Sequence, residues 1–267
     1  MTESSTPEVP ENLPAWSKDY RGMPNALARS ALFTVSRNGE RKKYRDEVIA
    51  STGDISIVYT GEELRQDDED VFLQVVNIAK AQHIGENINF TAYSMVTQLG
   101  WSKHSVSYAR LKESIGRMVG GTIELTVSLP DNVKLRYAGH LIGSFVHLEK
   151  ATDVQLSQWS VSLQKNMTKM FAPHAFSLIH WPTRRSMSPT TKWLHSYFST
   201  HKRPFPVKLE TLRRLMASET KSFRAYKTNI KESLVFLVDI GFFLAAHVDP
   251  VTDLVHVERA ADRKLLE

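Results

Sequence analysis

The chain has 267 residues, a net charge of +5 at pH 7, a hydrophobic fraction of 42% and a charged fraction of 24%. These values are ordinary for a globular protein and provide enough apolar material for two cores. The absence of cysteine excludes disulfides and thiolate metal sites. No apolar run predicts a membrane span and the acidic start lacks a signal-peptide pattern, so we expect a cytoplasmic protein.

Positive charge is concentrated in one stretch of the sequence. Residues 184–231 carry twelve lysines and arginines against two acidic residues, whereas residues 1–100 carry ten against fifteen. A solvated surface needs no such bias, because mixed charges keep a protein equally soluble. The stretch therefore indicates a polyanionic partner.

The first part of the chain predicts helices followed by a strand pair. We expect residues 1–22 to form a flexible lead. The elements expected after it are a charged loop (36–47), a strand (55–59), helices (68–81, 92–99, and Ser102 or Ser105 to Val119), a strand pair (122–127 and 134–148) and a further strand (153–163). Helix, helix, turn, helix and hairpin is the order of a winged helix, which we assign to residues 23–183.

The second part repeats this order of elements without repeating the sequence. A boundary is expected within 180–187. The elements expected beyond it are a helix from Ser188 and Pro189 to about Thr200, an extended stretch (207–209), a short helix (211–216), a turn (218–222), a long helix (223–240) and a hairpin (242–248 and 254–257). The sequence thus predicts an α+β protein of two tandem winged-helix domains, the second over 184–267.

The polar faces of the two long helices are the predicted DNA-reading surfaces, because the second helix of a helix-turn-helix enters the major groove. The second long helix presents basic and hydroxyl side chains with no acidic residue before Glu232, which opposes the helix dipole unless phosphate relieves it. The residues predicted on it are Lys221, Ser222, Arg224, Lys227, Thr228 and Lys231. Those predicted on and before the first long helix are Lys103, His104, Ser107, Arg110, Ser114 and Arg117. An ordinary solvated helix face remains the alternative for each.

Four further arginines are expected to contact phosphate and to set position rather than specificity. They are Arg184 and Arg185 at the boundary and Arg213 and Arg214 on the preceding short helix.

The sequence offers little for catalysis. The ten histidines are scattered, and no phosphate-binding loop or nucleophile elbow is present. The acidic run Asp67–Asp70 suits a helix start better than a metal site, since consecutive carboxylates point to different sides of a helix turn. We predict no catalytic residue, no metal and no cofactor.

Several short segments resemble one known family. They are Met23-Pro24-Asn25 with Ala28–Thr34, Tyr59–Asp68, Leu99-Gly100-Trp101-Ser102, and Tyr197-Phe198-Ser199 with Lys208-Leu209-Glu210-Thr211. Together they resemble the TrfA family of plasmid replication initiators over roughly residues 15–258.

This resemblance implies two winged-helix domains whose reading helices correspond to residues 105–119 and 222–240. It further implies a bacterial protein, associated with its plasmid, that binds repeated sites (iterons) in the double-stranded DNA of an origin and melts adjacent AT-rich DNA. Implied partners are the host initiator DnaA, the replicative helicase and the polymerase sliding clamp. A monomer–dimer equilibrium and copy-number control are also implied. The family's clamp-binding peptide has no match in Pro7–Leu13, so direct clamp recruitment is not expected.

Three other functions are compatible with the composition. A transcriptional repressor of the same fold would bind DNA without initiating replication. A nuclease or primase would hold its substrate on the basic surface, although the sequence shows no carboxylate cluster for it. A scaffold would bind an acidic protein there instead, and steeply salt-dependent specific DNA binding would argue against that.

Overall fold

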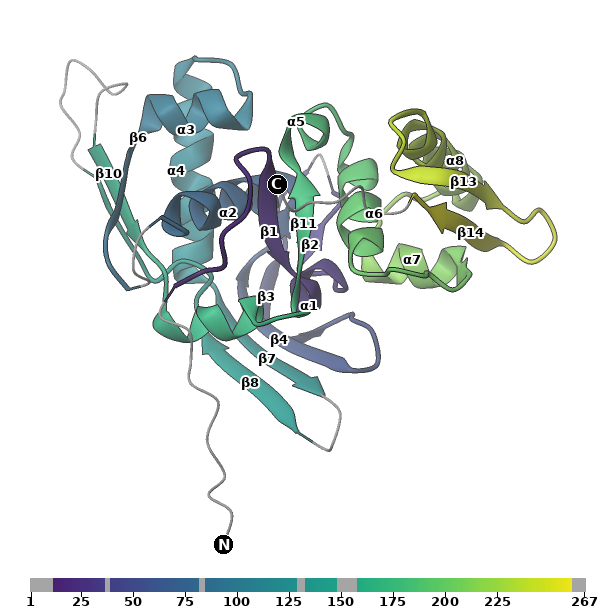
Figure 1. The fold of residues 1–267 in the computed structure, drawn as a ribbon, viewed down its shortest axis with the longest axis horizontal. Helices are drawn as coiled ribbons and strands as arrows, with labels where there is room; N and C mark the ends of the chain where they lie inside the picture. Colours follow the sequence, from purple (N-terminus) through teal and green to yellow (C-terminus); the bar gives the residue numbers. More distant parts are fainter. Residues whose placement is uncertain (1–11, 37–38, 82–84, 129–132, 148–157, 261–267) are drawn as a thin grey trace, which may run out of the picture.

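The computed structural model describes residues 12–36, 39–81, 85–128, 133–147 and 158–260, which form a mixed α/β structure (Figure 1). The elements in chain order are β1 (Tyr20–Pro24), α1 (Asn25–Ala28), β2 (Phe33–Thr34), β3 (Lys43–Ile49), β4 (Ile55–Glu62), β5 (Leu64–Arg65), α2 (Gln66–Ala79), β6 (Ile88–Thr91), α3 (Ala92–Leu99), α4 (Ser105–Gly120), β7 (Thr122–Ser128), β8 (Lys134–Gly139), β9 (Ser144–His147), β10 (Gln158–Ser162), the 3-10 helix η3 (Lys165–Phe171), β11 (Phe176–His180), α5 (Trp181–Arg184), α6 (Pro189–Ser199), β12 (Val207–Lys208), α7 (Leu209–Leu215), α8 (Phe223–Asp239), β13 (Phe243–Val248) and β14 (Leu254–Arg259).

The helices expected in both halves of the chain are confirmed, because local signals define their ends. At the start of α2 the Asp68 carboxylate accepts a hydrogen bond of 2.8 Å from the Arg65 backbone N–H. Thr91 caps α3, which ends at Gly100 with a φ of 72°. That left-handed conformation favours glycine. Ser222 caps α8 by accepting a hydrogen bond from the backbone N–H of Ala225.

Two three-stranded antiparallel sheets share one strand order. In the first, β6 precedes the helix pair α3–α4 and pairs with β10, which pairs with β9. In the second, β12 precedes the helix pair α7–α8 and pairs with β14, which pairs with β13. In each sheet the strand that leads into the helix pair therefore lies beside the last strand.

The hairpin that the sequence predicts after the first long helix belongs to a different sheet. Strands β7 and β8 do pair, but β7 also pairs with β4, which gives a four-stranded sheet in the order β3-β4-β7-β8. The hairpin that completes the sheet of β6 is instead β9–β10 (Figure 1). The single strand expected over residues 134–148 is wrong, because β8 ends at Gly139 and β9 begins at Ser144. The pairing of β7 with β4 was not expected, because it spans more than 60 residues of sequence and leaves no local signal. The turn expected at residues 130–132 lies outside the described residues.

The prediction of a flexible lead over residues 1–22 is wrong for its described part. Leu13 is buried, and the indole N–H of Trp16 donates a hydrogen bond of 3.1 Å to Asn77 of α2. Residues 20–22 lie in β1, which pairs with β11. These few apolar anchors are enough to hold a segment of polar composition against the core. Residues 1–11 lie outside the described residues.

The charged segment predicted as a loop over residues 36–47 is also partly a strand. From Lys43 onward it forms β3, an edge strand that pairs with β4. Most of its side chains are exposed, which explains why it lacks the apolar alternation of a half-buried strand.

Two clusters of buried apolar side chains form the core. The first runs from Leu13 to Trp181 and the second from Met187 to Val255. They are joined by buried polar contacts, among them the hydrogen bond of 3.3 Å from the Trp193 indole to the Ser30 carbonyl. The division into two domains at residue 184 stays a prediction. Below, "first unit" and "second unit" mean the parts of the chain that form these two clusters.

Candidate nucleic-acid interface

One face of α8 is exposed and predominantly basic. Arg224, Thr228 and Lys231 are exposed, while Tyr226 and Ile230 are buried against the second cluster. The exposed residues recur at spacings of three and four, so they form one stripe that begins in the first turn of the helix. Arginine, lysine and hydroxyl side chains on such a stripe can contact base edges and phosphates.

Lys227, predicted on the same stripe, lies at its flank. Its ammonium group forms an ion pair with the Asp253 carboxylate, which lies in the turn between β13 and β14. The pair joins the helix to the hairpin and leaves the lysine half-buried. Lys227 is therefore tied to the hairpin, whereas the hydroxyl of Thr228 donates a hydrogen bond of 3.1 Å within α8, to the Arg224 carbonyl.

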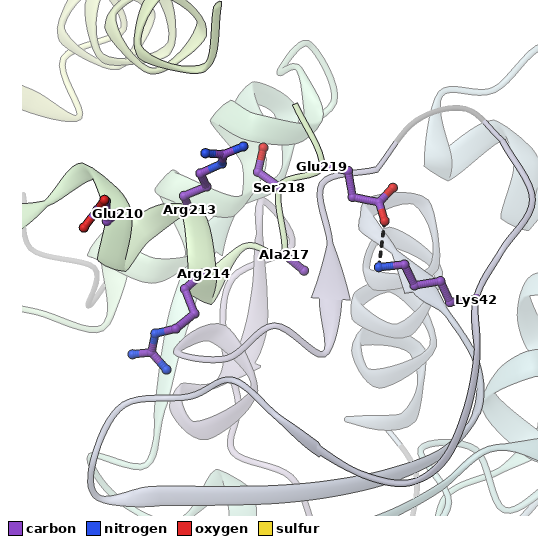
Figure 2. Close-up of a pocket in the computed structure, with 7 residues that line it drawn as sticks. All are labelled: Lys42, Glu210, Arg213, Arg214, Ala217, Ser218 and Glu219. Atoms are coloured by element: carbon purple, nitrogen blue, oxygen red, sulfur yellow. Dashed lines mark ion pairs between the residues drawn. The ribbon is translucent and has the colours of Figure 1, made fainter. Parts of the chain in front are cut away.

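A shallow pocket of about 480 Å³ lies between Lys42 of the first unit and α7 with the segment that follows it in the second. Its lining residues, drawn in Figure 2, are Lys42, Glu210, Arg213, Arg214, Ala217, Ser218 and Glu219. The Arg213 guanidinium donates a hydrogen bond of 2.6 Å to the Thr220 carbonyl. Lys42 of the first unit forms an ion pair of 2.7 Å with Glu219 of the second. Arg214 is exposed and, like Arg213, remains a predicted phosphate contact, while the exposed Lys221 remains a predicted residue of the reading surface of α8.

The face predicted for α4 is largely buried, and that prediction is wrong for three of its four residues. Ser107 is 8% exposed and Ser114 is fully buried. The Arg117 side chain is 8% exposed and donates hydrogen bonds of 2.8 and 3.2 Å to Asp68 of α2. The physical reason is that α4 packs against α2 as well as α3, so its buried stripe is wider than its apolar residues suggest.

The remaining residues predicted on or before α4 lie at the surface with local partners. The Arg110 guanidinium donates a hydrogen bond of 3.1 Å to Asp67 and lies 4.2 Å from the centre of the Trp101 ring. The Lys103 ammonium donates a hydrogen bond of 2.6 Å to the Tyr93 hydroxyl. His104 is exposed at the N-cap position of α4. These side chains could reach DNA only by sharing or leaving their partners.

The electrostatics around Asp67 favour its ion pairs. Burial would raise the pKa of Asp67, but the Arg110 and Arg41 guanidinium groups outweigh it and hold the pKa below its ordinary value. Asp67 is therefore ionised at neutral pH, and it neutralises positive charge that the sequence assigned to DNA binding.

Arg184 and Arg185, neighbours in sequence, have opposite environments. Arg184 is fully buried, and its guanidinium forms ion pairs of 2.7 Å with Asp70 and 3.1 Å with Glu69. It also donates a hydrogen bond of 2.9 Å to Ser196 of α6, so it fastens α2 of the first unit to the second unit. Burial lowers its pKa, but the two carboxylates outweigh this and raise the pKa above its ordinary value. The prediction that Arg184 contacts phosphate is wrong, because its side chain is buried. Arg185 is exposed and stays a predicted phosphate contact.

Comparison with known proteins agrees with this arrangement. The model of the TrfA protein family matches residues 11–259. The chain belongs to the TrfA family. The plasmid replication initiator protein TrfA of Escherichia coli is 34% identical over 250 residues, which cover 91% of this chain and 63% of that protein. This TrfA-family chain thus spans less than two thirds of the length of its curated relative.

Solved structures with the same fold are known despite low sequence identity. A structure of domains 2 and 3 of RctB, determined from selenomethionine derivatives, has a TM-score of 0.57 and 13% identity, and covers 80% of this chain and 85% of that one. A second structure of these RctB domains has a TM-score of 0.53 and 13% identity, and covers 86% of each chain. The likeness shows the fold shared by the TrfA-family chain and these domains.

The residues that sequence reasoning missed are the acidic ones of α2. The sequence assigned Asp67–Asp70 to the helix start, where Asp68 accepts a hydrogen bond from the Arg65 backbone N–H. The same four residues also form ion pairs with basic side chains from five places in the chain. Those partners are Arg41, Arg110, Arg117, Arg184 and Lys192. The available signal was the local excess of four consecutive carboxylates, more than one helix start needs.

Within the described ranges, no group of three or more histidine and acidic side chains is arranged to hold a metal ion. No helix among the described residues is both long and apolar enough to cross a bilayer.

Proposed function

We propose that this chain is a plasmid replication initiator that binds iterons in the double-stranded DNA of an origin. Membership of the TrfA family and the initiator name of the Escherichia coli relative support the proposal. The single observation that carries the DNA-binding part is the exposed basic stripe of α8, at the N-terminal half of the second helix of a helix pair. A helix in this position is the one that enters a major groove.

The proposal includes two tandem winged-helix domains. It is supported by the shared order of a strand, two helices and a hairpin, with the first strand beside the last one in both three-stranded sheets. On this assignment the wings are β9–β10 and β13–β14, and the reading helices are α4 and α8. Lys227 and Asp253 would then set the angle between the second reading helix and its wing.

The mechanism would be non-covalent. Binding of several copies to repeated sites would supply the free energy for melting adjacent AT-rich DNA, which costs a few kcal/mol for each unstacked step. We also propose, from the family, that the chain engages DnaA and the replicative helicase and that a monomer–dimer equilibrium limits copy number. No observation favours the sliding clamp as a direct partner.

The test is binding to a duplex from the origin of the plasmid that encodes this chain, against a scrambled duplex, across a salt series. We expect the origin duplex to bind about 10³-fold more tightly or better, with affinity falling steeply as salt rises. Equal binding of the two duplexes would contradict the proposal. Failure of a plasmid with this origin to require the protein for replication would indicate a repressor instead.

A further inference from the structure

The exposed stripe of α4 is more apolar than that of α8. Successive helical residues are about 100° apart, so Val106, Ala109, Glu113 and Gly116 lie on the side opposite the buried Leu111. Val106 is 76% exposed, and Ala109 is also exposed. Arg110, one turn after Val106, is exposed at the edge of this stripe, but its guanidinium contacts Asp67 and the Trp101 ring.

Val106 occupies the same place in α4 as Arg224 does in α8. Val106 is the second residue after the N-cap His104, and Arg224 is the second after the N-cap Ser222. Both side chains are exposed. Because the first turns of a reading helix meet base edges, the two positions are equivalent with respect to a major groove. One carries a guanidinium group and the other an isopropyl group.

The chemistry of the isopropyl group restricts what it can recognise. In the major groove, thymine alone presents a methyl group, at C5, and small apolar side chains contact it. Contact between the two removes apolar surface of both from water, which is favourable. Ala109, one turn later on the same stripe, extends the apolar surface in the direction of the helix axis.

We propose that Val106, assisted by Ala109, recognises thymine methyl groups and is a specificity-determining residue of the first unit. The inference rests on the proposed function, since that function places α4 in a major groove. It assigns the two units different tasks. The second unit supplies contacts to phosphates and guanine, and the first unit discriminates thymine from the other bases.

The test uses origin duplexes in which single thymines are replaced by deoxyuridine, which lacks only the C5 methyl group. We expect replacement at one or two positions to weaken binding about 4-fold, the value of one buried methyl group. Val106→Ser should weaken binding to the unmodified duplex by a similar factor. The affinity of this variant should not change further when deoxyuridine replaces thymine at those positions. The matched control is Val235→Ser, which alters a valine that is 59% exposed near the C-terminal end of α8 and should keep the full sensitivity.

Two results would overturn the inference. One is that the wild-type protein prefers the origin duplex over the scrambled duplex but binds every deoxyuridine duplex as tightly as the unmodified origin duplex. This result would leave the proposed function intact. The other is Val106→Ser retaining the wild-type sensitivity. If the wild-type protein shows no preference for the origin duplex, the proposed function and the inference fail together. Thermal unfolding of Val106→Ser should match that of the wild type, because the side chain is exposed.

Discussion

The long helices α4 and α8 each follow a shorter helix and a tight turn, and each precedes a strand (Figure 1). They differ in the partners of their basic side chains. In α8, Arg224 and Lys231 are exposed, and the ion pair of Lys227 joins the helix to its own hairpin. In α4, Arg110 and Arg117 contact the acidic start of α2. The comparison teaches that a basic residue on a predicted reading helix is a candidate for DNA binding only once the acidic residues packed beside it are known.

The largest expected effect tests the ion pairs of Arg184 with Glu69 and Asp70. Arg184→Ala should lower the free energy of unfolding by about 3–5 kcal/mol, because it leaves the buried carboxylate of Glu69 without its cation and leaves Asp70 with Lys192 alone. Arg185→Ala, at the exposed neighbour, should change it by no more than about 0.5 kcal/mol. Urea unfolding of both variants measures the difference, and similar losses in the two would contradict the assigned roles.

Next in size is the effect on specificity at α8. Arg224→Ala should reduce discrimination between the origin and scrambled duplexes by about 1–3 kcal/mol, the value of one bidentate contact to a base. Arg136→Ala, which removes an exposed arginine from β8 of the four-stranded sheet, is the control and should leave discrimination unchanged. Competition binding at fixed salt gives both values. A variant with Arg224→Ala that discriminates like the wild type would remove α8 from base recognition.

A pH effect on stability should come from the buried His195 of the second unit. Burial, together with the Arg184 and Arg259 charges, lowers the pKa of His195 to about 3. Between that value and the ordinary pKa of about 6.5 the unfolded chain binds the proton and the folded chain does not, so stability is lost as the pH falls through this window. The expected slope is about 1.4 kcal/mol per pH unit.

His195→Gln should remove most of this slope between pH 6 and pH 4.5, as measured by urea unfolding at a series of pH values. Parallel loss of stability in the wild type and the variant would show that other groups cause it.

The smallest effect concerns the predicted phosphate contacts near the pocket of Figure 2. Arg214→Ala should weaken binding to origin and scrambled duplexes alike and lower the slope of log affinity against log salt by about 1, because one phosphate contact is lost. Arg136→Ala again serves as the control. A change in sequence preference without a change in slope would instead assign Arg214 to base contact.

Local patterns were enough to predict most elements of the second unit. The caps at Ser188 and Ser222 and the two segments that become β13 and β14 lie within short stretches of sequence, and the structure confirms the elements they predict. The exposed stripe of α8 was predictable for the same reason. The apolar residues of α8 recur at helical spacing and mark its buried face, so the opposite face had to be exposed.

The first unit could not be predicted to the same degree, because its arrangement depends on distant pairs. Arg117 meets Asp68 across 49 residues, and β7 pairs with β4 from before the helix pair. Hydroxyls such as that of Ser114 look like surface residues in a periodic pattern, yet α4 buries it. Neither the width of a buried stripe nor the sheet to which a hairpin belongs is encoded locally.

The most direct test of the contrast between α4 and α8 measures two properties of two variants, Arg117→Ala and Arg224→Ala. For each, the free energy of unfolding and the preference for origin over scrambled duplex are determined under the same conditions. We predict that Arg117→Ala loses several kcal/mol of stability and, below its unfolding transition, keeps its preference, while Arg224→Ala keeps its stability and loses about 1–3 kcal/mol of its preference. The reverse pattern, or a loss of preference in both variants while folded, would contradict the account.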